Sequence, residues 1–151
     1  MALNVRSVEY YYATVQDIPG QAAELLKLLQ DGGVDLLAFS IVPTGPTHTQ
    51  LMLFPEAPAK LIHTTKRAGL QLTGPQHALM VTGDNELGAL VGIHQRLADN
   101  NINVYASNGV VDAVGGFGYV LYVRPEDFKL AATVAGVEGA PSFHPAPLLK
   151  K

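Results

Sequence analysis

The chain has 151 residues, of which 48% are hydrophobic and 15% are charged, and its formal net charge is −3. These values suit one globular domain, or two very small ones that share a core, and they argue against disorder and against nucleic acid or an anionic membrane as a partner. The sequence has no cysteine, no secretory leader pattern and no apolar run of membrane-spanning length, so we expect a soluble, cytoplasmic protein without disulfides or thiolate metal sites.

Along the first half of the chain, the spacing of the hydrophobic residues alternates between that of a strand and that of a helix. Residues 9–15 are aromatic and β-branched, as is typical of a strand. An apolar stripe with helical spacing follows, and the predicted helix ends at Gly32 and Gly33. After it we expect two strands around a turn, a second helix and a short strand. The stripe consists of Ala22, Leu25, Leu26 and Leu29, and the later elements are expected over 34–42, 49–54, 56–69 and 70–73.

The second half predicts the same order of elements. Its strands are expected over 77–83, 102–111 and 117–123, with a helix over 86–99 and another from about 126. The stripe of the first of these helices contains Leu87, Leu90, Val91 and Leu97, with His94 among them. The closing strand is weak because residues 136–147 are rich in glycine and proline, and we expect an irregular tail there.

The two halves align without a gap when one is shifted by 88 − 20 = 68 residues, the distance between Gly20 and Gly88. The sequence therefore predicts an α+β fold of tandem ferredoxin-like βαββαβ units, with antiparallel sheets and the helices on one face. We place the two domains at 1–73 and 74–137, followed by a tail at 138–151. The sheet edges of such units must be paired, which favours a shared sheet or a homodimer.

A short connection between a strand and a helix occurs in both halves, at residues 16–20 and 84–88, and we call it the joint. In the first half, Asp17 is able to cap a helix, Pro19 suits the first helical turn, and Gly20 allows a close approach. In the second half, Asn85 replaces the aspartate as a possible cap. A helix N-terminus with free N–H groups is suited to bind a carboxylate.

Residues 15–36, with Asp-x-Pro-Gly between a strand and a leucine-rich helix, resemble the ACT domain family of regulatory modules, and residues 81–104 resemble it less strictly because the proline is missing. The resemblance covers about residues 8–136. It implies a ferredoxin-like fold that binds free amino acids at inter-domain or inter-subunit interfaces. The contacts that it implies are Asp17, Ile18, Pro19, Gly20, Val34, Asp35 and Leu36, and in the second half Asn85, Glu86, Leu87, Gly88, Ile102, Asn103 and Val104.

The more polar second joint, which also contains Asp84, is the better candidate for ligand contacts. The resemblance predicts a non-catalytic, homodimeric regulatory protein with an amino acid ligand, no cofactor, and a separate enzyme as a possible regulated partner. No catalytic residue and no metal ligand is assigned. We expect His94 to be buried, hydrogen-bonded or interfacial rather than a ligand contact. The glycine-rich segment 106–118 fits a flexible loop near a site or a hairpin turn.

Three alternatives remain open. Both joints are explained as well by ordinary helix caps and tight turns. A metalloenzyme of the vicinal oxygen chelate type would require ligands such as Glu9, Glu56, His77 and Glu126, although that fold has one helix per half rather than two. A protein-interaction module that binds no metabolite would have the same fold and the same dimer.

Overall fold

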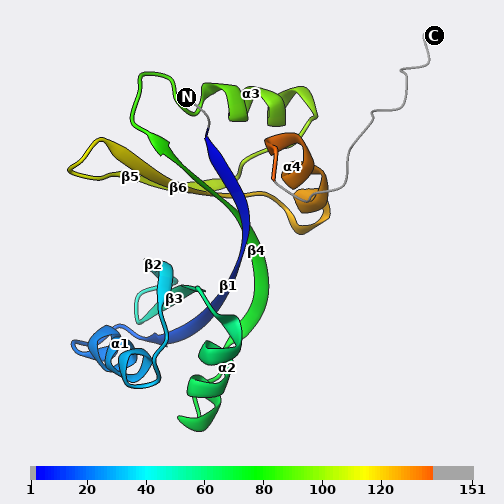
Figure 1. Cartoon of the computed structure of the whole chain (residues 1–151). Coiled ribbons are helices and arrows are strands. Elements are labelled where there is room, and N and C mark those ends of the chain that lie inside the picture. The colour runs from blue at the N-terminus through cyan, green and yellow to red at the C-terminus, as the bar shows by residue number, and fades with distance from the viewer. Residues whose placement is uncertain (1–2, 138–151) are drawn as a thin grey trace. The chain divides into compact units, whose positions relative to one another are not determined.

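The computed structural model describes residues 3–137, and the helices and strands in this range follow the predicted order (Figure 1). The predicted tail at 138–151 lies outside the described residues. None of the described helices is long and apolar enough to cross a membrane. The elements are β1 (Asn4–Gln16), α1 (Gln21–Asp31), β2 (Leu36–Pro43), β3 (His48–Pro55), α2 (Pro58–Arg67), β4 (Thr73–Asp84), α3 (Val91–Asp99), β5 (Ala106–Val111), β6 (Gly116–Tyr122), the 3₁₀ turn η1 (Pro125–Asp127) and α4 (Phe128–Ala135).

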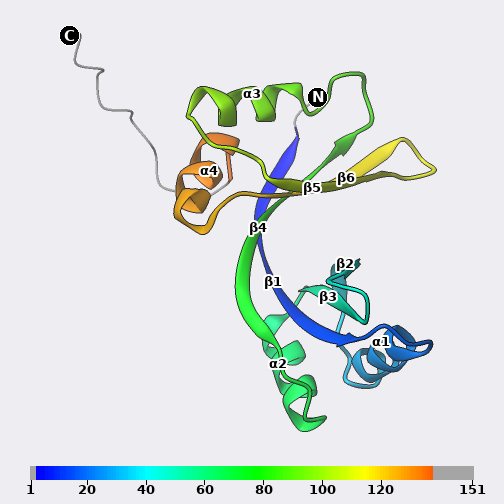
Figure 2. The same ribbon diagram turned by 180° about the vertical axis from the view of Figure 1, so that it is seen from behind.

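The described residues group into two compact units. The first unit consists of residues 9–76, and the second consists of residues 3–8 together with 77–137. The strand order is β2-β3-β1-β4 in the first unit and β1-β4-β6-β5 in the second. Each unit has two helices that contact each other, α1 with α2 and α3 with α4 (Figures 1 and 2). The predicted α+β fold with antiparallel strand pairs is confirmed.

One strand replaces the two that the sequence predicts around residue 73. β4 begins at Thr73 and continues to Asp84, so the expected domain boundary at 73/74 falls at the start of this strand. The expected strand over 70–73 is wrong except for its last residue. Residues 4–8 of β1 belong to the second unit, where they pair beside β4. They fill the place of the closing strand that the Gly/Pro-rich segment was unsuited to form.

Both units pair their strands in the same register. In the first unit Tyr11 lies opposite Leu53, and the 68-residue shift maps this pair onto Leu79 opposite Leu121 in the second. The outer pairs agree as well, because Ile41 opposite Leu51 maps onto Gly109 opposite Tyr119. Corresponding residues of the two halves therefore hold corresponding places in their sheets.

Each unit has its own hydrophobic core between helices and sheet. In the first, Leu25 and Leu29 of α1 pack with strand residues such as Leu51 and Leu53. In the second, Ile93 and Leu97 of α3 pack with residues of β4, β6 and α4. The predicted stripes are only partly correct, since Leu26, Leu87 and Val91 are exposed.

Both helices that follow the joints begin later than the capping hypothesis requires. α1 begins after Gly20, which has a φ of 94° and no side-chain cap, so Asp17 does not cap the helix and Pro19 precedes it. α3 begins only at Val91, five residues after the predicted start, and neither Asn85 nor any other side chain caps it. For α1, the missing side-chain cap follows from Gly20 at the cap position. A glycine in the left-handed conformation turns the chain into the helix but has no side chain that could accept a hydrogen bond.

Candidate functional site

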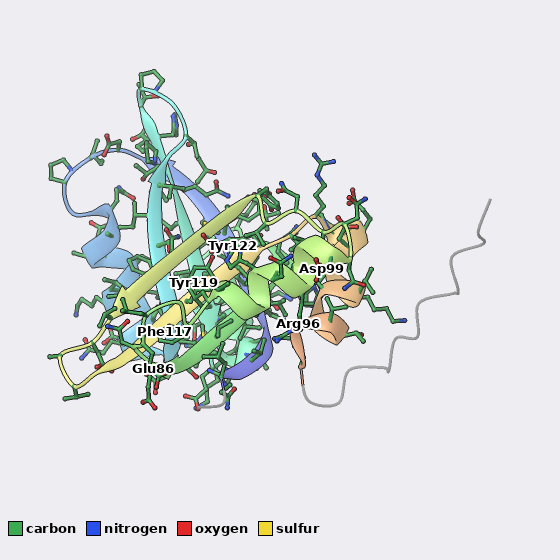
Figure 3. All side chains as sticks on the ribbon, turned by 90° about the horizontal axis from the view of Figure 1, so that it is seen from above. Glu86, Arg96, Asp99, Phe117, Tyr119 and Tyr122 are labelled. Atoms are coloured by element: carbon green, nitrogen blue, oxygen red, sulfur yellow. The ribbon has the colours of Figure 1, made fainter. Side chains whose placement is uncertain are left out.

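A cavity of about 340 Å³ opens in the second unit between the joint that precedes α3 and the β5–β6 hairpin. Its size is at the lower end of the range for small-molecule sites. Figure 3 shows Glu86 and Phe117 toward the hairpin turn, with Tyr119 farther along β6. The cavity is lined by Asn85, Glu86, Gly88, Ala89, Leu90, Val91, Gly109, Val110, Val111, Phe117, Gly118 and Tyr119.

The joint that forms one wall is held by backbone hydrogen bonds. The N–H of Asn85 donates to the carbonyl of Gly115 at 2.8 Å, and the N–H of Val91 donates to the carbonyl of Gly88 at 3.0 Å. Gly88 has a φ of 71°, a left-handed conformation that disfavours other residues. The joint therefore folds as a turn, and Leu90 and Val91 at the N-terminus of α3 border the cavity.

The opposite wall is the inner face of the β5–β6 hairpin. Gly109 faces Tyr119 and Val111 faces Phe117 as cross-strand pairs, so these four residues share one face. The hairpin turn is fixed by Asp112, whose Oδ1 accepts hydrogen bonds from the N–H groups of Val114 and Gly116, both at 2.8 Å. These bonds lower the pKa of the Asp112 carboxyl below its usual value. Of the two interpretations of segment 106–118, the hairpin is confirmed.

A polar pair ties this wall to α3. Nε2 of His94 and the hydroxyl of Tyr119 are 2.8 Å apart, and their rings lie 5.8 Å apart. His94 is half-buried and Tyr119 is buried. The expectation of a hydrogen-bonded His94 is thus confirmed. Because Tyr119 lines the cavity, the pair fixes the position of one wall.

The structure separates the predicted contacts of the second half into two places. Asn85, Glu86 and Gly88 line the cavity. Asp84 ends β4 opposite Gly116, and Leu87 points fully into solvent, so neither lines it. The later contacts Ile102, Asn103 and Val104 line a different groove of about 440 Å³ beside α3, together with His94 and Tyr105.

The predicted contacts of the first half are also divided. Val34, Asp35 and Leu36 line a groove of about 540 Å³ beside α1, which corresponds by the 68-residue shift to the groove at 102–104. Asp17, Ile18, Pro19 and Gly20 are exposed and line none of these three spaces. In neither half do the two predicted sets of contacts line the same one of these three spaces.

The sequence reasoning missed the hairpin wall. Gly109, Val111, Phe117 and Tyr119 follow the joint by twenty residues or more and belong to no motif. The one available signal is the repeat itself, because the 68-residue shift places Gly109 where the first half has Ile41. A glycine inside a strand marks a place where another group comes close.

The cavity carries little charge. Glu86 is the one charged residue in its described lining. Within residues 3–137, no group of three or more His, Asp or Glu side chains is placed to hold a metal ion. The arrangement thus offers a carboxylate, a carboxamide, the positive end of a helix dipole and apolar walls, which is the chemistry of a binding site for a small zwitterion.

No protein-family model matches the sequence, and no curated protein is similar to it. Solved structures, in contrast, are similar in fold. The crystal structure of protein BT0572 from Bacteroides thetaiotaomicron has a TM-score of 0.73 at 14% identity, covering 87% of this chain and 88% of that one. The ligand-free regulatory subunit of aspartate kinase from Thermus thermophilus has a TM-score of 0.58 at 15% identity, covering 89% and 93%. The corresponding subunit from Thermus flavus has a TM-score of 0.52 at 15% identity, also covering 89% and 93%.

At 14–15% identity these similarities establish the fold alone. The chain has an ACT-like, ferredoxin-like α+β fold.

Proposed function

We propose that this protein is a non-catalytic regulatory module that binds a free amino acid in the cavity of its second unit. The observation that carries this proposal is the cavity of about 340 Å³ that joins Asn85, Glu86 and the start of α3 to an apolar wall. The similar structures described as regulatory subunits of aspartate kinase support a regulatory role.

The proposed ligand contacts follow from the chemistry of the two walls. The carboxylate of the amino acid lies at the N-terminus of α3, where the helix dipole is positive. The ammonium group binds the carboxylate of Glu86 and the side-chain oxygen of Asn85. The side chain of the ligand lies against Phe117 and Tyr119. Each of these protein groups lines the cavity.

The lining also supports binding rather than catalysis. In the described lining there is no serine, cysteine, lysine or histidine that could serve as a nucleophile or carry a proton. The phenol of Tyr119 is within hydrogen-bond distance of His94. We therefore propose no catalytic residue, no metal and no cofactor.

Regulation is proposed to occur through assembly. β2 and β5 are the edge strands of their units, and β5 is exposed along its whole length. Exposed apolar side chains, namely Leu87, Val91 and Val110, lie at or beside the cavity lining. A homodimer that covers this surface would enclose the ligand at the interface, and the ligand would then favour one arrangement of the dimer over another. The regulated partner would be a separate enzyme.

The experiment is a thermal-melt screen of the purified chain against the twenty amino acids, with EDTA and divalent metals in parallel. A ligand at a hundredfold above its dissociation constant adds about 2.7 kcal/mol to the free energy of unfolding. We expect one amino acid, or one chemical class, to raise the melting temperature by several degrees while EDTA has no effect. Sedimentation with and without that amino acid tests the dimer.

The charge contact is tested with a matched pair of variants. Glu86→Gln should weaken amino acid binding by about tenfold, equivalent to about 1.4 kcal/mol, because the ammonium group loses its carboxylate. Glu24→Gln makes the same charge change in α1 of the first unit and should leave the affinity unchanged. Stabilisation by a metal and sensitivity to EDTA would contradict the proposal in favour of a metalloenzyme. A flat response to amino acids and metals would instead favour an interaction module.

A further inference from the structure

The two units differ at one position of the wall that lines the cavity. Gly109 of β5 lies opposite Tyr119 of β6, and the corresponding pair in the first unit is Ile41 opposite Leu51. The register is the same in both units, so the comparison is residue by residue. The first unit therefore carries a branched side chain where the second has none.

The glycine is not required by the backbone. Its φ lies outside the left-handed range, so any L-residue is able to adopt the conformation. A Cβ at this position would lie 3.1 Å from Cδ2 of Tyr119, which is tighter than an ordinary contact. A side chain here would therefore project over the Tyr119 ring, one of the surfaces that line the cavity. The space, rather than the turn chemistry, accounts for glycine at position 109.

The helix beside the cavity differs as well. α1 begins at Gln21, whereas α3 begins at Val91, which corresponds to Ala23. The chain before α3 thus remains a turn for two residues that are helical in the first unit, and these residues, Ala89 and Leu90, line the cavity. Both differences lie in the lining of the same cavity.

Accepting the proposed function above, we propose further that only the second unit binds the ligand, with one site per chain. Gly109 is the residue that determines specificity, because it leaves room for an apolar side chain. The wall around it consists of Val111, Phe117 and Tyr119 and holds no charged group. The ligand class is thus an amino acid with an aliphatic or aromatic side chain, not one with a charged side chain.

The test is an NMR titration of the ¹⁵N-labelled chain with each of the twenty amino acids as probes. We expect valine, leucine, isoleucine or phenylalanine to shift amide signals at 85–91 and 109–119. The corresponding signals at 17–23 and 41–51 should remain unchanged. Lysine, aspartate and glutamate should produce no comparable shifts.

Two substitutions at position 109 test the specificity, and one neighbouring substitution is the control. Gly109→Ile, which introduces the residue of the first unit, should weaken binding of the best probe by at least about tenfold. Gly109→Ala, which adds only the Cβ, should weaken leucine or phenylalanine more than alanine and so change the order of preference. Asn108→Ile places the same side chain on the opposite face of β5 and should leave affinity unchanged.

The outcomes separate this inference from the proposed function. Equal shifts in both units, or shifts confined to the first, would overturn the inference and leave amino acid binding intact. Unchanged affinity and unchanged preference in folded Gly109→Ala would also overturn it, even if Gly109→Ile fails to fold. Absence of shifts with all twenty probes would overturn the proposed function, and with it the inference.

Discussion

Nε2 of His94 and the hydroxyl of Tyr119 are 2.8 Å apart, which joins the middle of α3 to the centre of β6. The same two places in the first unit hold Leu26 and Leu51, so an apolar pair in one unit corresponds to a polar pair in the other. Tyr119 lines the cavity, and His94 lines the groove at residues 102–107. The hydrogen-bonded pair thus stands between the two spaces that contain the predicted contacts of the second half.

A double-mutant cycle on this pair should reveal a coupling energy of about 1 kcal/mol, the net value of a typical protein hydrogen bond. The variants are His94→Leu, Tyr119→Phe and the double substitution, measured by urea denaturation. Each single change should lower the free energy of unfolding, and the second change should cost less once the first is present. Strictly additive losses would show that the two side chains contribute only through packing.

Gly32→Ala should destabilise the first unit by about 1–3 kcal/mol, because its Cβ would overlap the side chain of Thr64. Gly32 has a φ of −84°, so backbone strain does not contribute. Without the overlap, replacing glycine by alanine would be mildly stabilising. In a Thr64→Ala background, where the overlapping side chain is gone, Gly32→Ala should therefore lower the free energy of unfolding much less than it does in the wild type. Failure of this recovery in chemical denaturation would contradict the close contact of α1 with α2.

Lowering the pH should loosen the β5–β6 hairpin through Asp112. Backbone N–H bonds from Gly116 and Val114 lower the pKa of its carboxyl below 3.8. A carboxyl whose pKa is lower in the folded state stabilises the fold above its unfolded pKa, and this contribution is lost as the pH falls through the folded value. The amide signals of Val114 and Gly116 should therefore titrate together at a pH below the ordinary carboxyl value of 3.8.

Asp112→Asn supplies the control for that titration. The amide oxygen still accepts hydrogen bonds, but the side chain no longer titrates. The transition at Val114 and Gly116 should therefore disappear while the hairpin persists at neutral pH. A titration that remains in the variant would assign the effect to another group.

Ile93→Ala should cost about 2–5 kcal/mol, because the side chain is fully buried in the core of the second unit. Val91→Ala should change the free energy of unfolding by less than about 0.5 kcal/mol, since Val91 is 65% exposed. Comparable losses from the two variants would mean that α3 begins earlier and presents the face that the sequence pattern predicted.

The sequence predicted the order of the elements because periodicity is a strong signal over whole helices and strands. Leu25 and Leu29 are buried as expected, and Gly32 and Gly33 follow the last residue of α1. The predicted apolar stripe is wrong where α3 begins. Leu87 and Val91 keep the spacing of a helix, but Leu87 lies before the helix, Val91 is its first residue, and both are exposed. The second joint has Leu87 where the first has Pro19, and apolar spacing carries no information about the length of the turn before the helix.

The candidate site was predictable only in part, for a geometric reason. Asn85, Glu86 and Gly88 follow a strand directly and could be found from the joint. Gly109 and Tyr119 form the facing wall through the pairing of β5 with β6, and the sequence alone does not state which residues lie opposite. A residue-by-residue comparison of the two halves would have singled out Gly109, because isoleucine occupies that place in the first half.

Residues 3–8 and 77–137 form one unit although the whole first unit, residues 9–76, separates them in the sequence. Shortening the protein from its N-terminus thus removes a strand from the second unit, although most of that unit lies in the second half of the sequence. Conversely, a circularly permuted gene in which residues 3–8 follow residue 137 would make that unit continuous. A cut between residues 76 and 77 would therefore keep residues 9–76 together but would separate residues 3–8 from the rest of the second unit.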